Sequence, residues 1–251
     1  YFTKTKGCKI WDLENKKYFD LSFMGVGTNL LGYSNNFVDK AVKKIVNDGN
    51  ISTLNSTEEI ILAEKLIDLN KWAKFVRFAR TGGEASSIAL RIARAATNRD
   101  TVAVCGYHGW HDWYIGSTTR DLGITTEGKK LTHKFKYNDL DSLDYLLKSH
   151  LGEFAAVIIE PMNVEWPKAG YLEKVADLVR SHGALLIFDE TITGFRFDLS
   201  GAQNYFNVIP DLATFGKGIA NGFPLSVLTG KKKYMELVEK IFFSGTFGGE
   251  T

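Results

Sequence analysis

The sequence has 251 residues, of which 44% are hydrophobic and 24% are charged. This composition is typical of a globular protein and excludes a disordered or fibrous chain. The 31 Lys and Arg residues nearly balance the 29 Asp and Glu residues, which leaves a net charge of +2. Such a balance gives no electrostatic reason to expect nucleic acid or an anionic membrane as a partner.

The apolar runs and the cysteines bear on where the protein is found. The longest apolar runs, residues 154–159 and 184–188, are too short to span a bilayer. No secretory signal is visible, and Cys8 and Cys105 are too few for a disulfide framework, so we expect a cytoplasmic protein. The chain begins at Tyr1 and stops directly after a glycine-rich run, so we expect both ends to be cut.

The predicted elements fall into two parts. A short hairpin over residues 9–11 and 17–20 is followed by amphipathic helices over residues 36–47 and 57–69. From Lys74 onward, short apolar strands alternate with helices. The strands are predicted over residues 75–78, 101–105, 155–159, 184–188, 212–215 and 225–229. The helices between them are predicted over residues 84–97, 140–149, 172–181 and 231–240. Alternation of this kind predicts an α/β fold with a largely parallel sheet.

The segment Thr81-Gly82-Gly83-Glu84 joins a predicted strand to a strongly periodic predicted helix. Glycines at a helix start let backbone N–H groups approach an anion, and the helix dipole favours negative charge there. The alternative is a tight strand-to-helix turn in which Thr81 only caps the helix. The motif alone is compatible with either interpretation.

The apolar strand predicted over residues 184–188 leads directly into Asp189-Glu190. Open α/β sheets bind ligands at the carboxyl ends of their strands, so Asp189 is expected at a ligand-binding edge. A partly buried carboxylate needs a cation or a strong hydrogen-bond donor as its partner. Three partners are open: Arg196 on the following turn, the protonated ring nitrogen of a ligand, or a metal ion held together with Glu190.

Lys217 lies between Gly216 and Gly218, after the strand predicted over residues 212–215. Desolvation there would lower its pKa and expose a nucleophilic amine, whereas a solvated loop lysine would do neither. The spacing of a P-loop is absent. An anion-binding turn, a strand-end carboxylate and a strand-end lysine in one domain match the phosphate, pyridinium and aldehyde of pyridoxal 5'-phosphate (PLP).

His108, His111 and Asp112 lie close together in the sequence and suggest a metal site. Two histidines three residues apart suit a helix, but Gly109 and the position after a predicted strand indicate a loop. We therefore predict no metal at this segment.

Several stretches of the chain together resemble the class III aminotransferases, which are PLP-dependent enzymes of the aspartate-aminotransferase fold. They are residues 81–97, GYHGWHD at 106–112, IIEPM at 158–162, HGALLIFDETITGFR at 182–196, GAQNYFNVIPDLATFGKGIANGFP at 201–224 and SGTFGGET at 244–251. Their order and spacing are most similar to the branch that contains glutamate-1-semialdehyde 2,1-aminomutase. The resemblance implies that residues 51–251 form a PLP-binding large domain of fold type I, with a mostly parallel central sheet flanked by helices. Residues 1–50 would be a partial arm, and we expect the family's C-terminal small domain to be absent from this chain.

The resemblance also implies roles for individual residues. Lys217 would form a Schiff base with the cofactor and then move protons. Asp189 would keep the pyridinium protonated, so that the ring accepts electrons from the substrate's α-carbon. Gly82 and Gly83 would donate backbone N–H groups to the phosphate, and Tyr107 would stack on the ring. His108, next to Tyr107, is expected to be structural.

Three further positions match the family's cofactor site or depart from it. Glu160 resembles a strand-end glutamate near a cofactor oxygen. Thr246 lies in a turn that would reach the phosphate of the neighbouring subunit, which implies a homodimer with shared active sites. Thr191 stands where the family usually has Val under the ring. The family commonly has Thr at the position of Gly83, so a hydroxyl is missing there, and Thr81 is one candidate to replace it.

The function that the resemblance implies is PLP-dependent amino-group transfer between a small-molecule amino donor and a keto or aldehyde acceptor. One alternative is glutamate-1-semialdehyde 2,1-aminomutase, which moves the amino group within a single molecule. Another is a catalytically silent relative that acts as a binding subunit. The retention of Asp189, Lys217 and the phosphate turn argues against a silent protein.

Overall fold

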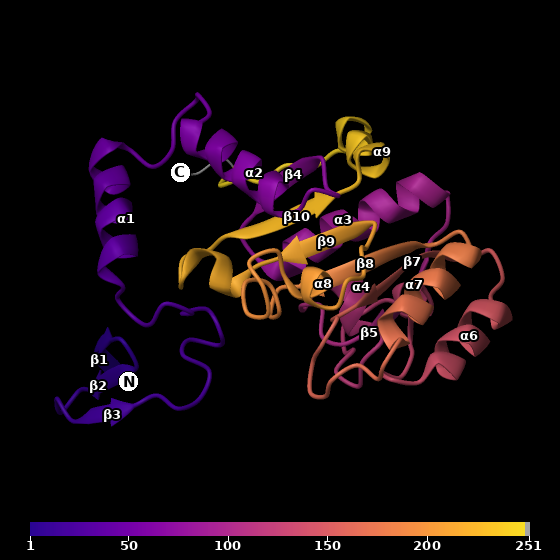
Figure 1. The fold of residues 1–251 in the computed structure, drawn as a ribbon, viewed down its shortest axis with the longest axis horizontal. Helices are drawn as coiled ribbons and strands as arrows, with labels where there is room; N and C mark the ends of the chain where they lie inside the picture. The colour runs from indigo at the N-terminus through magenta and orange to yellow at the C-terminus, as the bar shows by residue number, and fades with distance from the viewer. Residues whose placement is uncertain (249–251) are drawn as a thin grey trace.

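A seven-stranded sheet forms the centre of the chain (Figure 1) in the computed structural model, which describes residues 1–248. Its strand order is β4-β10-β9-β8-β7-β5-β6. The strands are β4 (Phe75–Ala79), β5 (Thr101–Cys105), β6 (Thr132–Lys134), β7 (Phe154–Ile159), β8 (Leu185–Glu190), β9 (Leu212–Phe215) and β10 (Ser226–Gly230). The pairs from β6 to β9 are all parallel, and β10 is antiparallel to both of its neighbours. The predicted α/β fold with a mostly parallel sheet is confirmed.

Helices cover both faces of this sheet, so its inner strands are buried on both sides. Helix α3 (Gly82–Thr97) packs on one face, against side chains such as Ile158 and Ile187. Helices α6 (Leu140–Ser149) and α7 (Tyr171–Ser181) pack on the other face (Figure 1), where Val157 and Ile159 point. Successive strand residues thus alternate between two cores.

The first elements of the chain, up to helix α1, lie apart from the central sheet (Figure 1). The strands β1 (Phe2–Lys6), β2 (Lys9–Asp12) and β3 (Lys17–Phe19) form a small antiparallel sheet of their own. Its β2–β3 pair is the predicted hairpin, whereas β1 was not predicted. Helix α1 (Asn36–Asp48) has no buried residue, and α2 (Thr57–Leu69) contributes Leu66 to the core. The two predicted helices are confirmed.

Other differences from the predicted elements involve short segments. The helix predicted over residues 231–240 is divided into α9 (Lys232–Met235) and a 3-10 segment, η2 (Glu236–Lys240). The other unpredicted elements are β6, α4 (Asp112–Ile115), α5 (Thr126–Lys130), α8 (Ala202–Tyr205) and the 3-10 turn η1 (Lys217–Ala220). Each has three to five residues, which is too short to show a periodic apolar pattern. Among the described residues, none of the helices has the length and apolar character that a membrane crossing requires.

Candidate active site

The first turn of α3 is held in place by a reciprocal cap. The Thr81 hydroxyl accepts a hydrogen bond from the Glu84 N–H at 3.3 Å, and the Glu84 carboxylate accepts one from the Thr81 N–H at 2.8 Å. Gly82 and Gly83 are the first two residues of this 16-residue helix. Their N–H groups lie in the first turn, where no carbonyl of the helix accepts a hydrogen bond from them. These N–H groups are therefore available to an anion.

Gly82 lies directly against Thr191. A Cβ atom added at Gly82 would be 2.9 Å from both branch atoms of the Thr191 side chain. One added at Gly83 would be 3.6 Å from the His111 ring, an ordinary van der Waals distance. Position 82 therefore requires glycine, whereas the space around Gly83 would accept a methyl group.

We predict that Gly82→Ala destabilises the protein by about 1–3 kcal/mol, because the new methyl group overpacks against Thr191. Gly83→Ala is the matched control and is expected to be neutral or stabilising, since alanine favours helix by up to about 1 kcal/mol. Thermal unfolding of both variants measures the difference, at about 2–4 °C per kcal/mol. Equal melting temperatures for the two variants would contradict this account of the turn.

Asp189 lies near the carboxyl end of β8 and is 3% exposed. One carboxylate oxygen is 2.8 Å from Nδ1 of His108, and the other accepts hydrogen bonds from the Thr191 N–H at 3.0 Å and the Thr214 hydroxyl at 3.3 Å. Burial alone would raise the pKa of Asp189, but the hydrogen bonds from His108 and Thr191 hold that pKa below its usual value. Asp189 is therefore a buried anion.

Arg196, one of the three partners left open for Asp189, does not bind it in the structure. The Arg196 guanidinium donates instead to the carbonyl oxygens of Ile192 and Gly27. His108, which we expected to be structural, holds Asp189 and lines a cavity together with it. Its other ring nitrogen, Nε2, is buried without a hydrogen-bond partner among the described residues.

Lys217 follows β9 and opens the turn η1. Its φ of +45° is in the left-handed region, which non-glycine residues rarely adopt outside constrained sites. Burial lowers the pKa of its amine, an effect opposed by the nearby carboxylates of Glu160 and Asp189. A lowered pKa leaves more of the amine neutral at pH 7, which is the nucleophilic form.

Glu160 and Tyr107 are joined at the ends of β7 and β5. The Glu160 carboxylate, 3% exposed, accepts hydrogen bonds from the Tyr107 N–H at 2.9 Å and from the Asn163 side chain. Burial raises the pKa of Glu160 above its ordinary value, and the Tyr107 hydrogen bond opposes that rise. Gly106 has a φ of +116°, and a Cβ there would collide with Glu160. The Tyr107 ring is 58% exposed, so it is available to a ligand.

One cavity of about 390 Å³ brings most of the predicted site residues together. Its lining includes Gly82, Gly83, Tyr107, Glu160, Asp189, Thr191 and Lys217. The volume suits a small-molecule ligand. The N–H groups at the start of α3, a buried carboxylate and a lysine with a lowered pKa thus line one cavity. These groups fit a ligand that carries a phosphate, a protonated ring nitrogen and an aldehyde.

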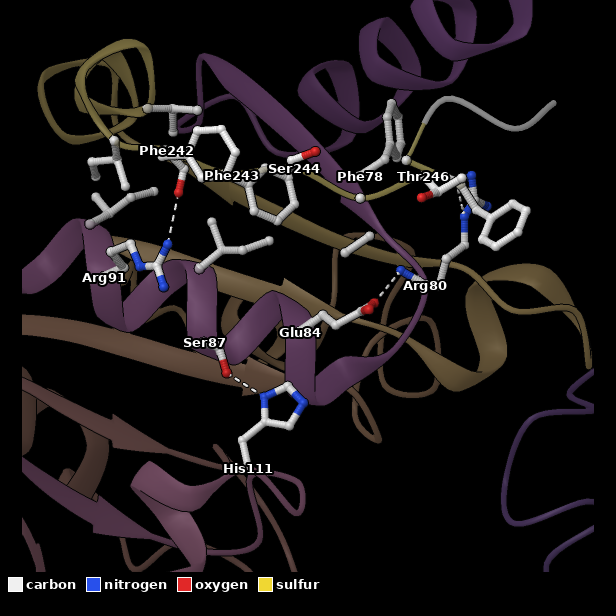
Figure 2. A pocket seen from close by; sticks show the side chains of 18 residues that line it. Phe78, Arg80, Glu84, Ser87, Arg91, His111, Phe242, Phe243, Ser244 and Thr246 are labelled. Atoms are coloured by element: carbon white, nitrogen blue, oxygen red, sulfur yellow. Dashed lines mark hydrogen bonds between the residues drawn. The ribbon is translucent and has the colours of Figure 1, made fainter. Parts of the chain in front are cut away.

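Thr246 does not line this cavity. It lines a neighbouring cavity of about 470 Å³ between α3 and residues 241–248, and Figure 2 shows it beside Arg80. Arg80 lines both cavities. The role predicted for Thr246 in a neighbouring subunit stays a prediction, and the last three residues of the segment 244–251 lie outside the described residues.

The histidines considered as metal ligands have separate partners. His108 pairs with Asp189, whereas Nδ1 of His111 is 2.6 Å from the Ser87 hydroxyl on α3 (Figure 2). Over residues 1–248 there is no group of three or more His, Cys, Asp or Glu side chains that could hold a metal ion.

Glu190 does not share a ligand with Asp189, because it faces the other side of β8. Its carboxylate accepts hydrogen bonds from the Thr193 hydroxyl at 2.5 Å, the Ala202 N–H at 2.8 Å and the Gln203 N–H at 2.7 Å. It thereby anchors the start of α8. Burial raises the pKa of Glu190 to about 7, against the lowering effect of these hydrogen bonds.

This raised pKa predicts a pH-dependent stability. The folded protein binds the Glu190 proton more tightly than the unfolded chain, whose pKa is near 4.5. The contribution is thus fully present below pH 4.5 and is lost as the pH rises toward 7, by up to about 3 kcal/mol. We expect wild type to lose stability relative to Glu190→Gln over this range, measured by urea unfolding. A wild type that gains stability relative to Glu190→Gln as the pH rises, or a pH-independent difference between the two, would contradict the assignment.

The sequence profile of one protein family, described as Aminotransferase class-III, matches residues 1–251. This chain belongs to the class-III aminotransferase family. The resemblance inferred from the sequence motifs is therefore confirmed.

Curated relatives in this family include both of the enzyme types considered above. The chain is 38% identical to the 3-aminobutyryl-CoA aminotransferase of Cloacimonas acidaminovorans over 98% of its own length and 61% of that protein. It is 39% identical to the glutamate-1-semialdehyde 2,1-aminomutase of Methanosphaera stadtmanae over 99% of its own length and 63% of that protein. The chain thus spans about three fifths of the curated class-III relatives it matches.

Solved structures of class-III relatives share the fold. The chain superposes on the FumI protein of Sphingopyxis sp. MTA144, in its PLP internal aldimine form, with a TM-score of 0.92 and 30% identity, covering 100% of this chain and 61% of that one. An omega-transaminase from Sphaerobacter thermophilus gives a TM-score of 0.90 at 28% identity, covering 100% and 63%. The predicted fold class, a PLP fold type I large domain, is confirmed.

Proposed function

We propose that this chain carries the cofactor site of a PLP-dependent aminotransferase. Such an enzyme would move an amino group from a small-molecule donor to a keto or aldehyde acceptor. The observation that carries the proposal is that Asp189 and Lys217 line the same cavity as the glycine-rich start of α3. PLP-containing structures of relatives and the class-III family match add support.

Bound PLP would supply an aldehyde that condenses with amines and a ring that accepts electrons. Lys217 would bind the aldehyde through its amine and then carry protons, helped by its lowered pKa. Asp189, kept ionised by His108, would hold a proton on the ring nitrogen. Gly82 and Gly83 would donate N–H groups to the phosphate. Tyr107 would lie against the ring from the exposed side.

Glutamate-1-semialdehyde 2,1-aminomutase is the second candidate, because aminomutase and aminotransferase relatives have nearly equal identity, 39% and 38%. The two reactions require the same cofactor groups. They differ in whether the amino group leaves the protein on a second molecule. Incubating PLP-loaded protein with single amino donors, and measuring release of the corresponding keto product, separates them. Keto product released in proportion to protein supports the aminotransferase.

A silent binding subunit is the third candidate. A silent protein has no need to retain Asp189, Lys217 and the glycine turn in one cavity. Absence of any change in the visible spectrum when PLP is added to the purified protein would favour this candidate over both enzymes.

We also propose how the protein assembles and where it is located. A homodimer with shared active sites follows from the predicted role of Thr246, and sedimentation of the full-length protein tests it. Cytoplasmic location is proposed from the cysteines, both of which are free in the structure. The division into an arm over residues 1–50 and a PLP-binding domain over residues 51–251 is likewise proposed.

A further inference from the structure

A left-handed turn of the backbone lies beside Lys217. Its residues Met24, Gly25, Val26 and Gly27 have φ values of +41°, +71°, +58° and +81°. Such values are outliers for a β-branched residue such as Val26, and they persist only where neighbouring contacts hold the backbone. A Cβ atom built on Gly27 would be 3.8 Å from Cδ of Lys217, so the turn packs directly against the lysine side chain.

Arg196 holds this turn from the segment that follows β8. Its guanidinium donates hydrogen bonds to the carbonyl oxygens of Gly27 and Ile192, the latter at 2.6 Å. The Cβ atom built on Gly27 would be only 3.0 Å from Nη2 of Arg196. The side chains of Arg196 and Lys217 therefore meet at the same glycine.

The positive charge of Arg196 is not balanced by a carboxylate. Both acceptors of its guanidinium are neutral backbone carbonyls, and within residues 1–248 no Asp or Glu side chain pairs with it. An arginine stays charged across the pH range in which proteins are folded. A nearby like charge disfavours the protonated form of an amine, and Arg196 accordingly lowers the pKa of Lys217.

Two carboxylates act on Lys217 in the opposite direction. Glu160 and Asp189 both raise the pKa of its amine, whereas burial and the charge of Arg196 lower it. The other titratable side chains that line the cavity are Arg80, Tyr107 and His108. Arg196 thus offsets part of the effect of the two carboxylates.

We propose that Arg196 is a positioning residue for Lys217, because it fixes the left-handed turn against the lysine side chain and supplies a positive charge that favours the neutral amine. This inference rests on the proposed function and deepens it, since the neutral amine is the form that would attack the aldehyde of PLP. The role requires no contact between Arg196 and a ligand.

Competitive labelling with a trace of acetic anhydride, an uncharged reagent that acetylates only neutral amines, tests this role. Peptide mass spectrometry gives the acetylation rate of Lys217 as a function of pH in the full-length protein without PLP. Arg196→Gln removes the charge, whereas Arg196→Lys keeps it. Near neutral pH we expect Lys217 to react about three- to tenfold more slowly in Arg196→Gln than in wild type, as the loss of one partly screened charge predicts. The rates should converge at high pH, and Arg196→Lys should stay within about twofold of wild type.

Arg180→Gln is the matched control. Arg180 is exposed on α7 and also donates to a backbone carbonyl, that of Ile209 at 2.6 Å. Its replacement should leave the labelling of Lys217 unchanged. Acetylation of the exposed Lys232 in each sample provides an internal reference, and melting temperatures check that the variants fold.

An unchanged pH profile of Lys217 in Arg196→Gln would overturn the proposal. Equal slowing in both Arg196 variants, or slowing by the same factor at every pH, would also overturn it, because a lost contact rather than a lost charge would then be responsible. Saturating PLP should protect Lys217 of wild type from acetylation. Absence of this protection would count against the proposed function, whereas the comparison of the variants concerns Arg196 alone.

Discussion

Replacing Lys217 by alanine is expected to lower kcat for amino-group transfer by about four orders of magnitude or more. Lys217 lines the cavity together with Asp189. Burial lowers the pKa of its amine. Among the described residues, no other lysine lines that cavity. PLP binding should remain measurable, because the glycine turn and Asp189 are unchanged.

Lys232→Ala is the matched control for this variant. Lys232 is exposed on α9, where it pairs with Glu236 at 3.5 Å, and does not line the cavity. Its replacement should leave kcat unchanged. Steady-state rates and PLP titrations of both variants decide the matter, and full activity in Lys217→Ala would refute the assigned role.

The second large effect is expected from Asp189→Asn. The substitution keeps the shape of the side chain but removes the charge that would hold a proton on the ring nitrogen. We expect kcat to fall by about a hundredfold or more, because this charge acts on the reaction itself. The dissociation constant of PLP should change by less than about tenfold, since the phosphate contacts remain.

Glu190→Gln serves as the control for Asp189→Asn. The two residues are adjacent on β8, but Glu190 is bound by Thr193, Ala202 and Gln203 on the far side of the strand. Its substitution should alter stability and leave kcat nearly intact. Equal losses of kcat and of PLP affinity in Asp189→Asn would show that Asp189 is only structural.

The site residues that could be predicted from the sequence are those that follow a predicted strand. Asp189 and Lys217 follow apolar strands, and parallel strands bring their carboxyl ends to one edge of a sheet. The structure places both residues in one cavity with Gly82. The same reasoning could not assign the partner of Asp189. Arg196 is near it in sequence but binds Gly27 and Ile192, whereas His108 is 81 residues away and reaches it through the fold.

The fold shows the same division between local and long-range information. Long periodic segments such as α3 and buried strands such as β7 were predicted, because their apolar spacing is visible in the sequence. The antiparallel direction of β10 was not, since it depends on the connection through η1 rather than on the strand's residues.

Lys217 and Asp189 should act on one molecule of PLP. Borohydride reduction of the PLP-loaded protein, followed by peptide mass spectrometry, should show a pyridoxyl group attached to Lys217. Attachment to another lysine, or no covalent attachment at all, would show that Lys217 does not bind the aldehyde of PLP.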